Sequence, residues 1–125
     1  MKRRVLIVED SGLTRMEVGD LLRHHFSAEV LEACDGKEGW EMLQQQPDLE
    51  LIISDIEMPE MNGVEFIRAV RSSNEYSFVP ILVMTTLGRI KDRDDALNAG
   101  ADGFIEKPVT LEALETLLED VWQSE

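Results

Sequence analysis

The chain has 125 residues and a formal net charge of −14, with 26 acidic side chains against 12 lysines and arginines. That length is enough for one domain with a sizeable core, and we expect no second output module beside it. The negative charge argues against direct binding to nucleic acid, which needs a positive field to displace counterions from phosphate, and favours partners or ions of positive charge.

Apolar segments are short throughout the sequence. None approaches the roughly 20 residues that a helix needs to cross a bilayer, so we expect no membrane contact. The run at residues 5–8 is also too short for a signal peptide, which predicts a cytoplasmic protein. The single cysteine, Cys34, cannot form an internal disulfide and is predicted to be a small, half-buried hydrophobic residue.

Five apolar runs are typical of β-strands, and they alternate with stretches of helical periodicity. The predicted strands cover residues 5–8, 29–33, 51–54, 81–85 and 103–106. Leu51, Ile52 and Ile53 are consecutive apolar residues, which indicates a strand covered on both faces. Strict alternation of strand and helix predicts an α/β fold with a parallel sheet, right-handed crossovers and helices on both faces.

Each stretch between or after the strands has an apolar face that can pack against a sheet. In chain order these predicted faces contain Val18, Leu21, Leu22 and Phe26; Trp40 and Leu43; Phe66, Ile67 and Val70; Ala96, Ala99 and Gly100; and Leu111, Leu114, Leu118, Val121 and Trp122. Residues that suit helix ends flank these stretches, with Ser11 and Thr110 as amino-terminal caps, Gly63 before the third helix and Gly100 at the end of the fourth.

Polar side chains stand where four of the predicted strands end: Glu9 and Asp10, Asp55, Thr85, and Lys107. Parallel strands carry such residues to one edge of the sheet, where ligands bind in open α/β folds. Three carboxylates this close repel one another unless a cation neutralises them, and Mg²⁺ fits because it needs few carboxylates and keeps several waters. With Thr85 and Lys107 aimed at the oxyanion that the metal holds, the set predicts a phosphoryl-binding site. An isolated Asp55 would instead be typical of a solvated strand end.

Several short motifs, in order along the chain, carry a family resemblance. They are Glu9-Asp10, Asp55 with Met58-Pro59 and Asn62-Gly63, Met84-Thr85-Thr86, the Ala-Gly-Ala-Asp-Gly run at residues 99–103, and Lys107-Pro108. Together they resemble the receiver domain of bacterial response regulators, including the chemotaxis regulators. The resemblance covers residues 1–125 as a single receiver domain. It implies a flavodoxin-like (βα)5 fold, with a five-stranded parallel sheet in the order 2-1-3-4-5.

The resemblance also implies roles for individual residues. Asp55 looks like the phosphoacceptor, whose carboxylate attacks the phosphoryl group of a kinase phosphohistidine. Asp10, Asp55 and the backbone carbonyl of Glu57 resemble the Mg²⁺ ligands, with Glu9 acting directly or through water. Catalysis would then consist mostly of positioning and electrostatic stabilisation.

Switching is implied by the same resemblance. Thr85 and Lys107 would complete the clamp around the phosphoryl group, and Thr85 would move toward it. Phe104, at the family's switch-aromatic position, would then rotate inward, which changes the surface of the fourth helix, fifth strand and fifth helix. Lys107-Pro108 resembles the family's cis peptide, with Pro108 as the candidate residue.

Two residues depart from the commonest family pattern, and two others occupy positions that tune loss of the phosphoryl group. Glu9 stands where Asp is usual, and the swap either changes the metal contact or has no consequence. Phe104 stands where Tyr is common, and it is either the switch or a plain core aromatic. Glu57 and Leu87 are the tuning residues, and the bulk of Leu87 is expected to obstruct an incoming water.

The implied partners are a sensor histidine kinase or a histidine phosphotransfer protein, and then a downstream protein target or output domain. A phosphorylation-dependent dimer also fits the resemblance. Leu13 and Met16 lie opposite the core stripe of the first predicted helix, and they are either a docking surface for the kinase or incidental surface residues.

Two other functions are compatible with parts of the sequence. A phosphorylation-independent interaction module is disfavoured, because such a module has no need of Asp55, Thr85 and Lys107 together. A phosphatase of the haloacid dehalogenase type is disfavoured because that family has a second Asp where this chain has Glu57. We therefore expect no enzyme activity beyond the chain's own phosphotransfer and dephosphorylation.

Overall fold

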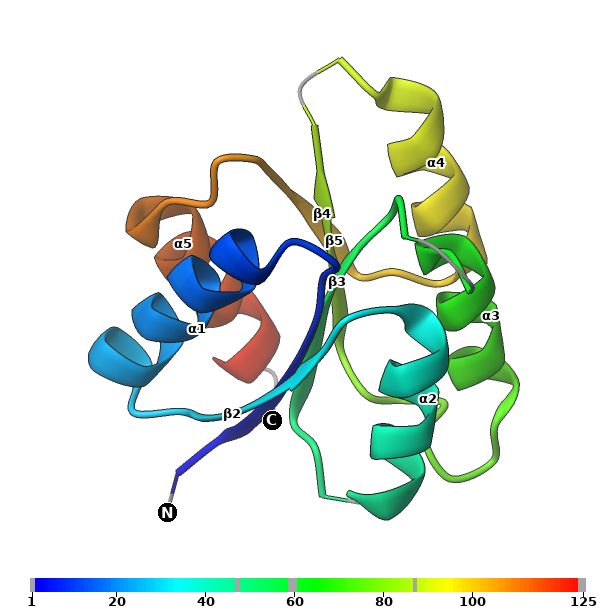
Figure 1. Ribbon diagram of the computed structural model, residues 1–125, viewed down its shortest axis with the longest axis horizontal. Helices are drawn as coiled ribbons and strands as arrows, with labels where there is room; N and C mark the ends of the chain where they lie inside the picture. The colour runs from blue at the N-terminus through cyan, green and yellow to red at the C-terminus, as the bar shows by residue number, and fades with distance from the viewer. Residues whose placement is uncertain (1, 47, 59–60, 87, 124–125) are drawn as a thin grey trace.

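The computed structural model describes residues 2–46, 48–58, 61–86 and 88–123. Within them strands and helices alternate as β1 (Arg4–Val8), α1 (Gly12–Phe26), β2 (Glu29–Ala33), α2 (Gly36–Gln45), β3 (Leu51–Asp55), α3 (Gly63–Ser72), β4 (Ile81–Thr85), α4 (Ile90–Ala99), β5 (Gly103–Glu106) and α5 (Leu111–Gln123) (Figure 1). The strands that the sequence predicts are all present. Two are longer than predicted by one residue, since β1 starts at Arg4 and β3 includes Asp55.

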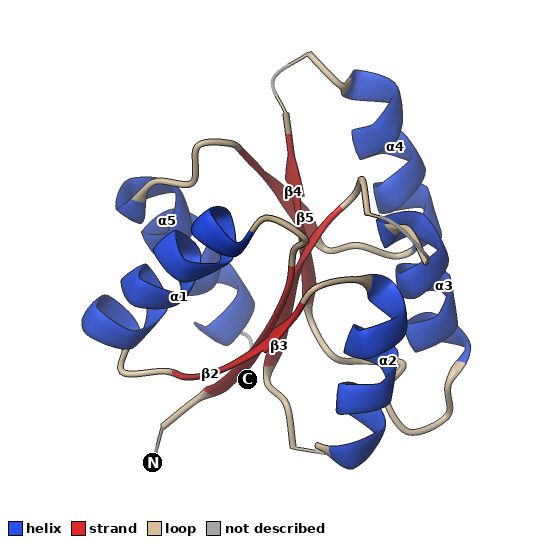
Figure 2. Ribbon diagram, in the orientation of Figure 1, coloured by secondary structure: helices blue, strands red, loops and turns tan. Residues whose placement is uncertain are grey.

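The five strands form one parallel sheet in the order β2-β1-β3-β4-β5, which confirms the predicted flavodoxin-like fold. Figure 2 shows α1 and α5 on one face of this sheet and α2, α3 and α4 on the other. The chain reverses its direction of winding between β1 and β3, and the ends of these two central strands flank the crevice in which such folds bind ligands.

Two apolar layers, one on each face of the sheet, hold the helices in place. The α1 and α5 side contains Val5, Ile7, Leu51, Ile53, Leu82 and Met84 from the strands and Val18, Leu22, Leu114 and Leu118 from the helices. The other side contains Leu6, Val8, Ile52, Ile81 and Val83 from the strands and Leu43, Phe66, Ile67, Val70 and Ala96 from the helices. Every residue of β3 and β4 is buried, as expected for strands covered on both faces.

Side-chain and backbone caps fix the helix ends that border the site. Ser11 caps α1 by accepting a hydrogen bond from the Thr14 amide at 3.3 Å. Asn62 caps α3 in a reciprocal arrangement with Glu65, so that Gly63 is the first helical residue rather than the one before the helix. Gly100 ends α4 with a φ of 122°, a conformation that favours glycine.

The prediction for Cys34 is wrong. Cys34 is exposed, not half-buried, because it follows the edge strand β2 and its backbone amide donates to the carboxylate of Glu38 at 3.1 Å. Leu87 and Pro59 lie outside the described residues. Among the described helices, none is long and apolar enough to cross a membrane.

Candidate functional site

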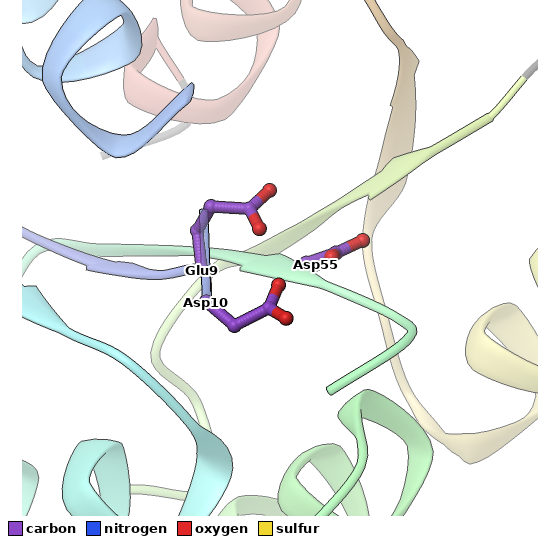
Figure 3. A group of neighbouring side chains, drawn as sticks. All are labelled: Glu9, Asp10 and Asp55. Atoms are coloured by element: carbon purple, nitrogen blue, oxygen red, sulfur yellow. The ribbon is translucent and has the colours of Figure 1, made fainter. Parts of the chain in front are cut away.

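The carboxyl ends of β1, β3, β4 and β5 open into one cavity of about 240 Å³. Its walls include the predicted residues Glu9, Asp10, Asp55, Thr85 and Lys107. Figure 3 shows the carboxylates of Glu9, Asp10 and Asp55 gathered beside one another, two from the end of β1 and one from the end of β3. The parallel sheet thus brings together residues that are far apart in the sequence.

Glu9 is the most deeply buried member of this cluster, with 1% of its residue surface exposed. Its Oε2 accepts a hydrogen bond from the Ser11 amide at 3.0 Å. Its Oε1 lies 2.8 Å from the Lys107 Nζ as an ion pair, yet no described residue donates to it with hydrogen-bond geometry. Burial raises the pKa of Glu9, with repulsion from Asp55 adding to the effect and Lys107 opposing it.

Asp55 is the last residue of β3, and its side chain is 10% exposed. One carboxylate oxygen accepts from the Ile56 amide at 2.9 Å, and the other lies 3.2 Å from the Lys107 Nζ. Burial raises the pKa of Asp55, although Lys107 lowers it in part. A carboxylate held this way is fixed in direction and remains open to the cavity.

Lys107 is the cation that joins the two buried acids. Its backbone amide donates to the carbonyl oxygen of Thr85 at 2.8 Å, which places it beside the end of β4. Burial lowers the pKa of Lys107, but the close negative charges of Glu9 and Asp55 outweigh it, so that the pKa is raised overall. The peptide bond from Lys107 to Pro108 is cis.

The donor set suits a hard divalent cation. Glu9, Asp10 and Asp55 can each offer a carboxylate oxygen, and these three oxygens lie within 4.8 Å of one another. One lysine, paired with Glu9 and Asp55, cannot balance three carboxylates, so the cluster has capacity for a further positive ligand. Oxygen-only donors with room for water are the environment that Mg²⁺ prefers. The residues present therefore fit this metal.

Thr85 and Phe104 lie on the α4 side of the cavity. Thr85 is buried, and its hydroxyl donates to the Thr86 carbonyl at 3.3 Å. Phe104 is half-buried and lies under the guanidinium of Arg93, at 4.7 Å from ring centroid to Cζ. A second cavity of about 240 Å³, lined by Thr85 and Phe104 among others, adjoins the first.

Two residues of the site were missed in the sequence. Arg15 of α1 donates to the Glu9 carbonyl oxygen at 2.6 Å and thereby holds the loop after β1. Arg89, just before α4, pairs with the side chain of Glu57 and lines the same cavity as Asp55. The available signal was an arginine four residues after Thr85, but sequence spacing does not say which loop it faces.

An acidic cavity that contains one lysine lies at the switch point of a five-stranded parallel sheet, which is the arrangement expected of a receiver domain. The family model for the response regulator receiver domain matches residues 5–119, so the chain belongs to that family. Within the family it is a chemotaxis-like receiver. It is 38% identical to a CheY homolog of Campylobacter jejuni over 118 residues, which are 94% of this chain and 91% of the relative.

Solved structures agree with this placement. The CheY4 chemotaxis protein of Vibrio cholerae has a TM-score of 0.88 and 36% identity, with 97% of this chain and 99% of that chain covered. The receiver domain of the Pseudomonas aeruginosa sensor kinase PA1611 has the same fold, with a TM-score of 0.89, 24% identity and full coverage of both chains. That structure holds a magnesium ion in its active-site cleft. Receiver domains of this kind act in signalling.

Proposed function

We propose that the chain accepts a phosphoryl group on Asp55 from the phosphohistidine of a sensor histidine kinase or a histidine phosphotransfer protein, in a reaction that needs Mg²⁺. The observation that carries this proposal is the cluster itself. A buried carboxylate lies 3.2 Å from a lysine ammonium and is clustered with the carboxylates of Glu9 and Asp10. The magnesium ion of the PA1611 receiver supports the choice of metal.

In the transfer step, an oxygen of Asp55 forms a bond to phosphorus while the bond from phosphorus to the donor nitrogen breaks. The electron pair of that bond returns to the imidazole of the donor. Lys107 and the Thr85 hydroxyl would bind the phosphoryl oxygens, and Asp10, Asp55 and the Glu57 backbone carbonyl would hold Mg²⁺, with Glu9 acting directly or through water. The metal would withdraw charge from the phosphoryl oxygens.

The same proposal includes the output. Movement of Thr85 toward the phosphoryl group would let Phe104 turn inward and change the α4, β5 and α5 surface that a target protein, an output domain or a second copy recognises. The phosphoryl group can shift this equilibrium only by its different contacts in the two states. Residues 1–125 would act as one receiver domain in the cytoplasm, catalysing only its own phosphotransfer and dephosphorylation.

A labelling experiment tests the central claim. Wild-type protein and Asp55→Asn are incubated with Mg²⁺ and a small phosphodonor such as acetyl phosphate. We expect acid-stable, alkali-labile phosphate on the wild type alone, and its loss when EDTA removes the metal. Absence of label on the wild type, with a histidine kinase also tried, would favour the phosphorylation-independent module instead. Label that persists in Asp55→Asn would place the acceptor elsewhere.

Leu13 and Met16 provide a test of the kinase-facing surface. Leu13 is 64% exposed and Met16 is 50% exposed. Both lie on α1, near the carboxyl edge of the sheet where Asp55 also lies. The double variant Leu13→Asp, Met16→Asp should slow transfer from a phosphohistidine donor by roughly tenfold or more, because docking would bury two unpaired charges in an apolar contact. Labelling by acetyl phosphate should not change. Phe78→Asp is the matched control, because Phe78 is 79% exposed on the loop before β4, at the opposite edge. Equal transfer rates for the double variant and the control would exclude this surface.

A further inference from the structure

Arg89 lines the Asp55 cavity with a side chain that is 45% exposed, and the proposed phosphoryl transfer does not use it. It is the residue just before α4, and its guanidinium pairs with the Glu57 side chain across the cavity wall. The same group contacts a carboxylate oxygen of Asp92, on the first turn of α4, at 2.5 Å. Arg89 thus connects the loop after β3 with the start of α4.

The partners of Arg89 hold it weakly. The side chains of Arg89, Glu57 and Asp92 are 45%, 58% and 30% exposed. Ion pairs that exposed contribute little, because solvent screens both charges and the long side chains lose freedom. The guanidinium can therefore change partners at small cost. Lys107, in contrast, pairs with the buried carboxylates of Glu9 and Asp55, and its own side chain is 25% exposed.

A phosphoryl group on Asp55 changes the charge balance at this point. It brings close to two negative charges and three acceptor oxygens into a cavity whose walls already include Glu57 and Asp92. A guanidinium is well suited to such a group, because its planar fork can donate to two oxygens at once. Among the described residues that line the cavity, the cations are Arg89 and Lys107, and Arg89 is the more exposed of the two.

We propose that Arg89 is a further phosphoryl-binding residue, whose guanidinium leaves Glu57 and donates to the phosphoryl oxygens on Asp55. This rests on the proposed function and adds a specific ligand to it. Because Arg89 also lines the neighbouring cavity with Phe104 and Arg93, its change of partner carries the start of α4 along. A phosphoryl group on Asp55 would then affect α4 through the Arg89 side chain as well as through Thr85.

Beryllium fluoride with Mg²⁺ tests this proposal, because it binds an aspartate carboxylate as a phosphoryl mimic without any transfer. Its apparent affinity is measured by calorimetry for the wild type and for Arg89→Gln, Arg89→Lys, Glu57→Gln and the double variant Glu57→Gln, Arg89→Gln. Arg89→Gln should bind more weakly by roughly tenfold or more, as expected for a lost charge-assisted hydrogen bond. Arg89→Lys should be intermediate.

The Glu57 variant separates phosphoryl binding from a merely structural ion pair. If Glu57 competes for the guanidinium, Glu57→Gln should bind the mimic about twofold more tightly, which is the scale of an exposed ion pair. In the Arg89→Gln background the same change should have a smaller effect. If the pair only braces the loop, both single variants should weaken binding. That outcome would overturn the proposal.

Two controls complete the design. Lys91→Gln removes the same unit charge from α4, two residues away, but Lys91 is 87% exposed and pairs with Asp95 outside the cavity, so the affinity should match the wild type. Mg²⁺ binding without the mimic should not weaken in Arg89→Gln, since the change removes a positive charge. A wild type that neither binds the mimic nor takes label on Asp55 would overturn the proposed function and this inference together. A wild type that does both, with Arg89→Gln equal to it, would overturn this inference alone.

Discussion

Replacing Gly63 with alanine is expected to destabilise the protein by about 2–4 kcal/mol and to slow labelling of Asp55. A Cβ atom on Gly63 would lie 2.5 Å from the Asp55 carbonyl oxygen and 2.7 Å from the Ile56 Cα. Both are backbone atoms of the segment that positions the acceptor, and the Gly63 amide also donates to the Ile56 carbonyl oxygen at 2.8 Å. The clash can be relieved only by moving the loop after β3.

Gly12→Ala is the matched control. Gly12 is the first residue of α1, as Gly63 is of α3, but its added Cβ would meet only the Arg15 guanidinium, at 3.8 Å. We expect a change within about 0.5 kcal/mol, which is typical of a surface substitution. Urea unfolding followed by circular dichroism gives both free energies. If the Gly63 variant is as stable as the Gly12 variant, the loop after β3 can move to accommodate the added Cβ at little cost, and the expectation is wrong.

Removing the Asp55 charge should stabilise the metal-free protein. Near neutral pH, Asp55→Asn is expected to raise the free energy of unfolding by on the order of 1 kcal/mol, because one buried carboxylate of the cluster is removed and Lys107 still pairs with Glu9. Mg²⁺ should stabilise the wild type by about 2.7 kcal/mol at a roughly hundredfold excess over its Kd, and the variant much less.

The pH dependence gives an independent check. Burial raises the pKa of both Asp55 and Glu9, so the folded state holds more protons than the unfolded chain above about pH 4. The free energy of unfolding of the metal-free wild type should therefore fall as the pH rises through these two raised pKa values. The fall should be shallower in Asp55→Asn, where Glu9 alone contributes. Stabilisation by Mg²⁺ should grow over the same range, because the metal binds the ionised acids.

Thermal unfolding in EDTA and in Mg²⁺, across a pH series, measures these quantities. Asp20→Asn is the control, because Asp20 is an acid on the outer surface of α1 whose side chain is 53% exposed. Its change should stay within about 0.5 kcal/mol at every pH. A metal-free Asp55→Asn protein that is less stable than the wild type would show that the hydrogen bond and ion pair of Asp55 outweigh the repulsion.

The fold could be predicted because its causes are local and periodic. The run from Leu51 to Ile53 is apolar on both sides of the strand, and only a sheet covered on both faces buries it. Asp55 and Lys107 end or follow predicted strands, so a parallel sheet sends them to the same edge whatever the details of the loops. Strand order entered through the family resemblance and not through the residues alone.

The parts that could not be predicted depend on loop geometry and side-chain reach. Sequence periodicity says nothing about Arg89 meeting Glu57, since the two residues lie on different loops. A metal contact of Glu9, direct or through water, is a prediction from the family resemblance, whereas its near-complete burial and its ion pair with Lys107 could not be predicted. Cys34 was misjudged because strand β2 is at the edge of the sheet, where a residue beyond the strand has little to cover it.

Helices α1 and α4 cover opposite faces of the sheet (Figure 1). The cavity of Asp55 is lined by Ser11, the cap of α1, and by Asp92 of α4. A kinase docked over Leu13 and Met16 of α1 would therefore leave the half-buried Phe104 and the outer side of α4 uncovered. Under the proposed function, donor binding and target binding would use different surfaces and need not exclude each other. A target bound at α4 would remain bound while the donor, docked on α1, transfers its phosphoryl group to Asp55.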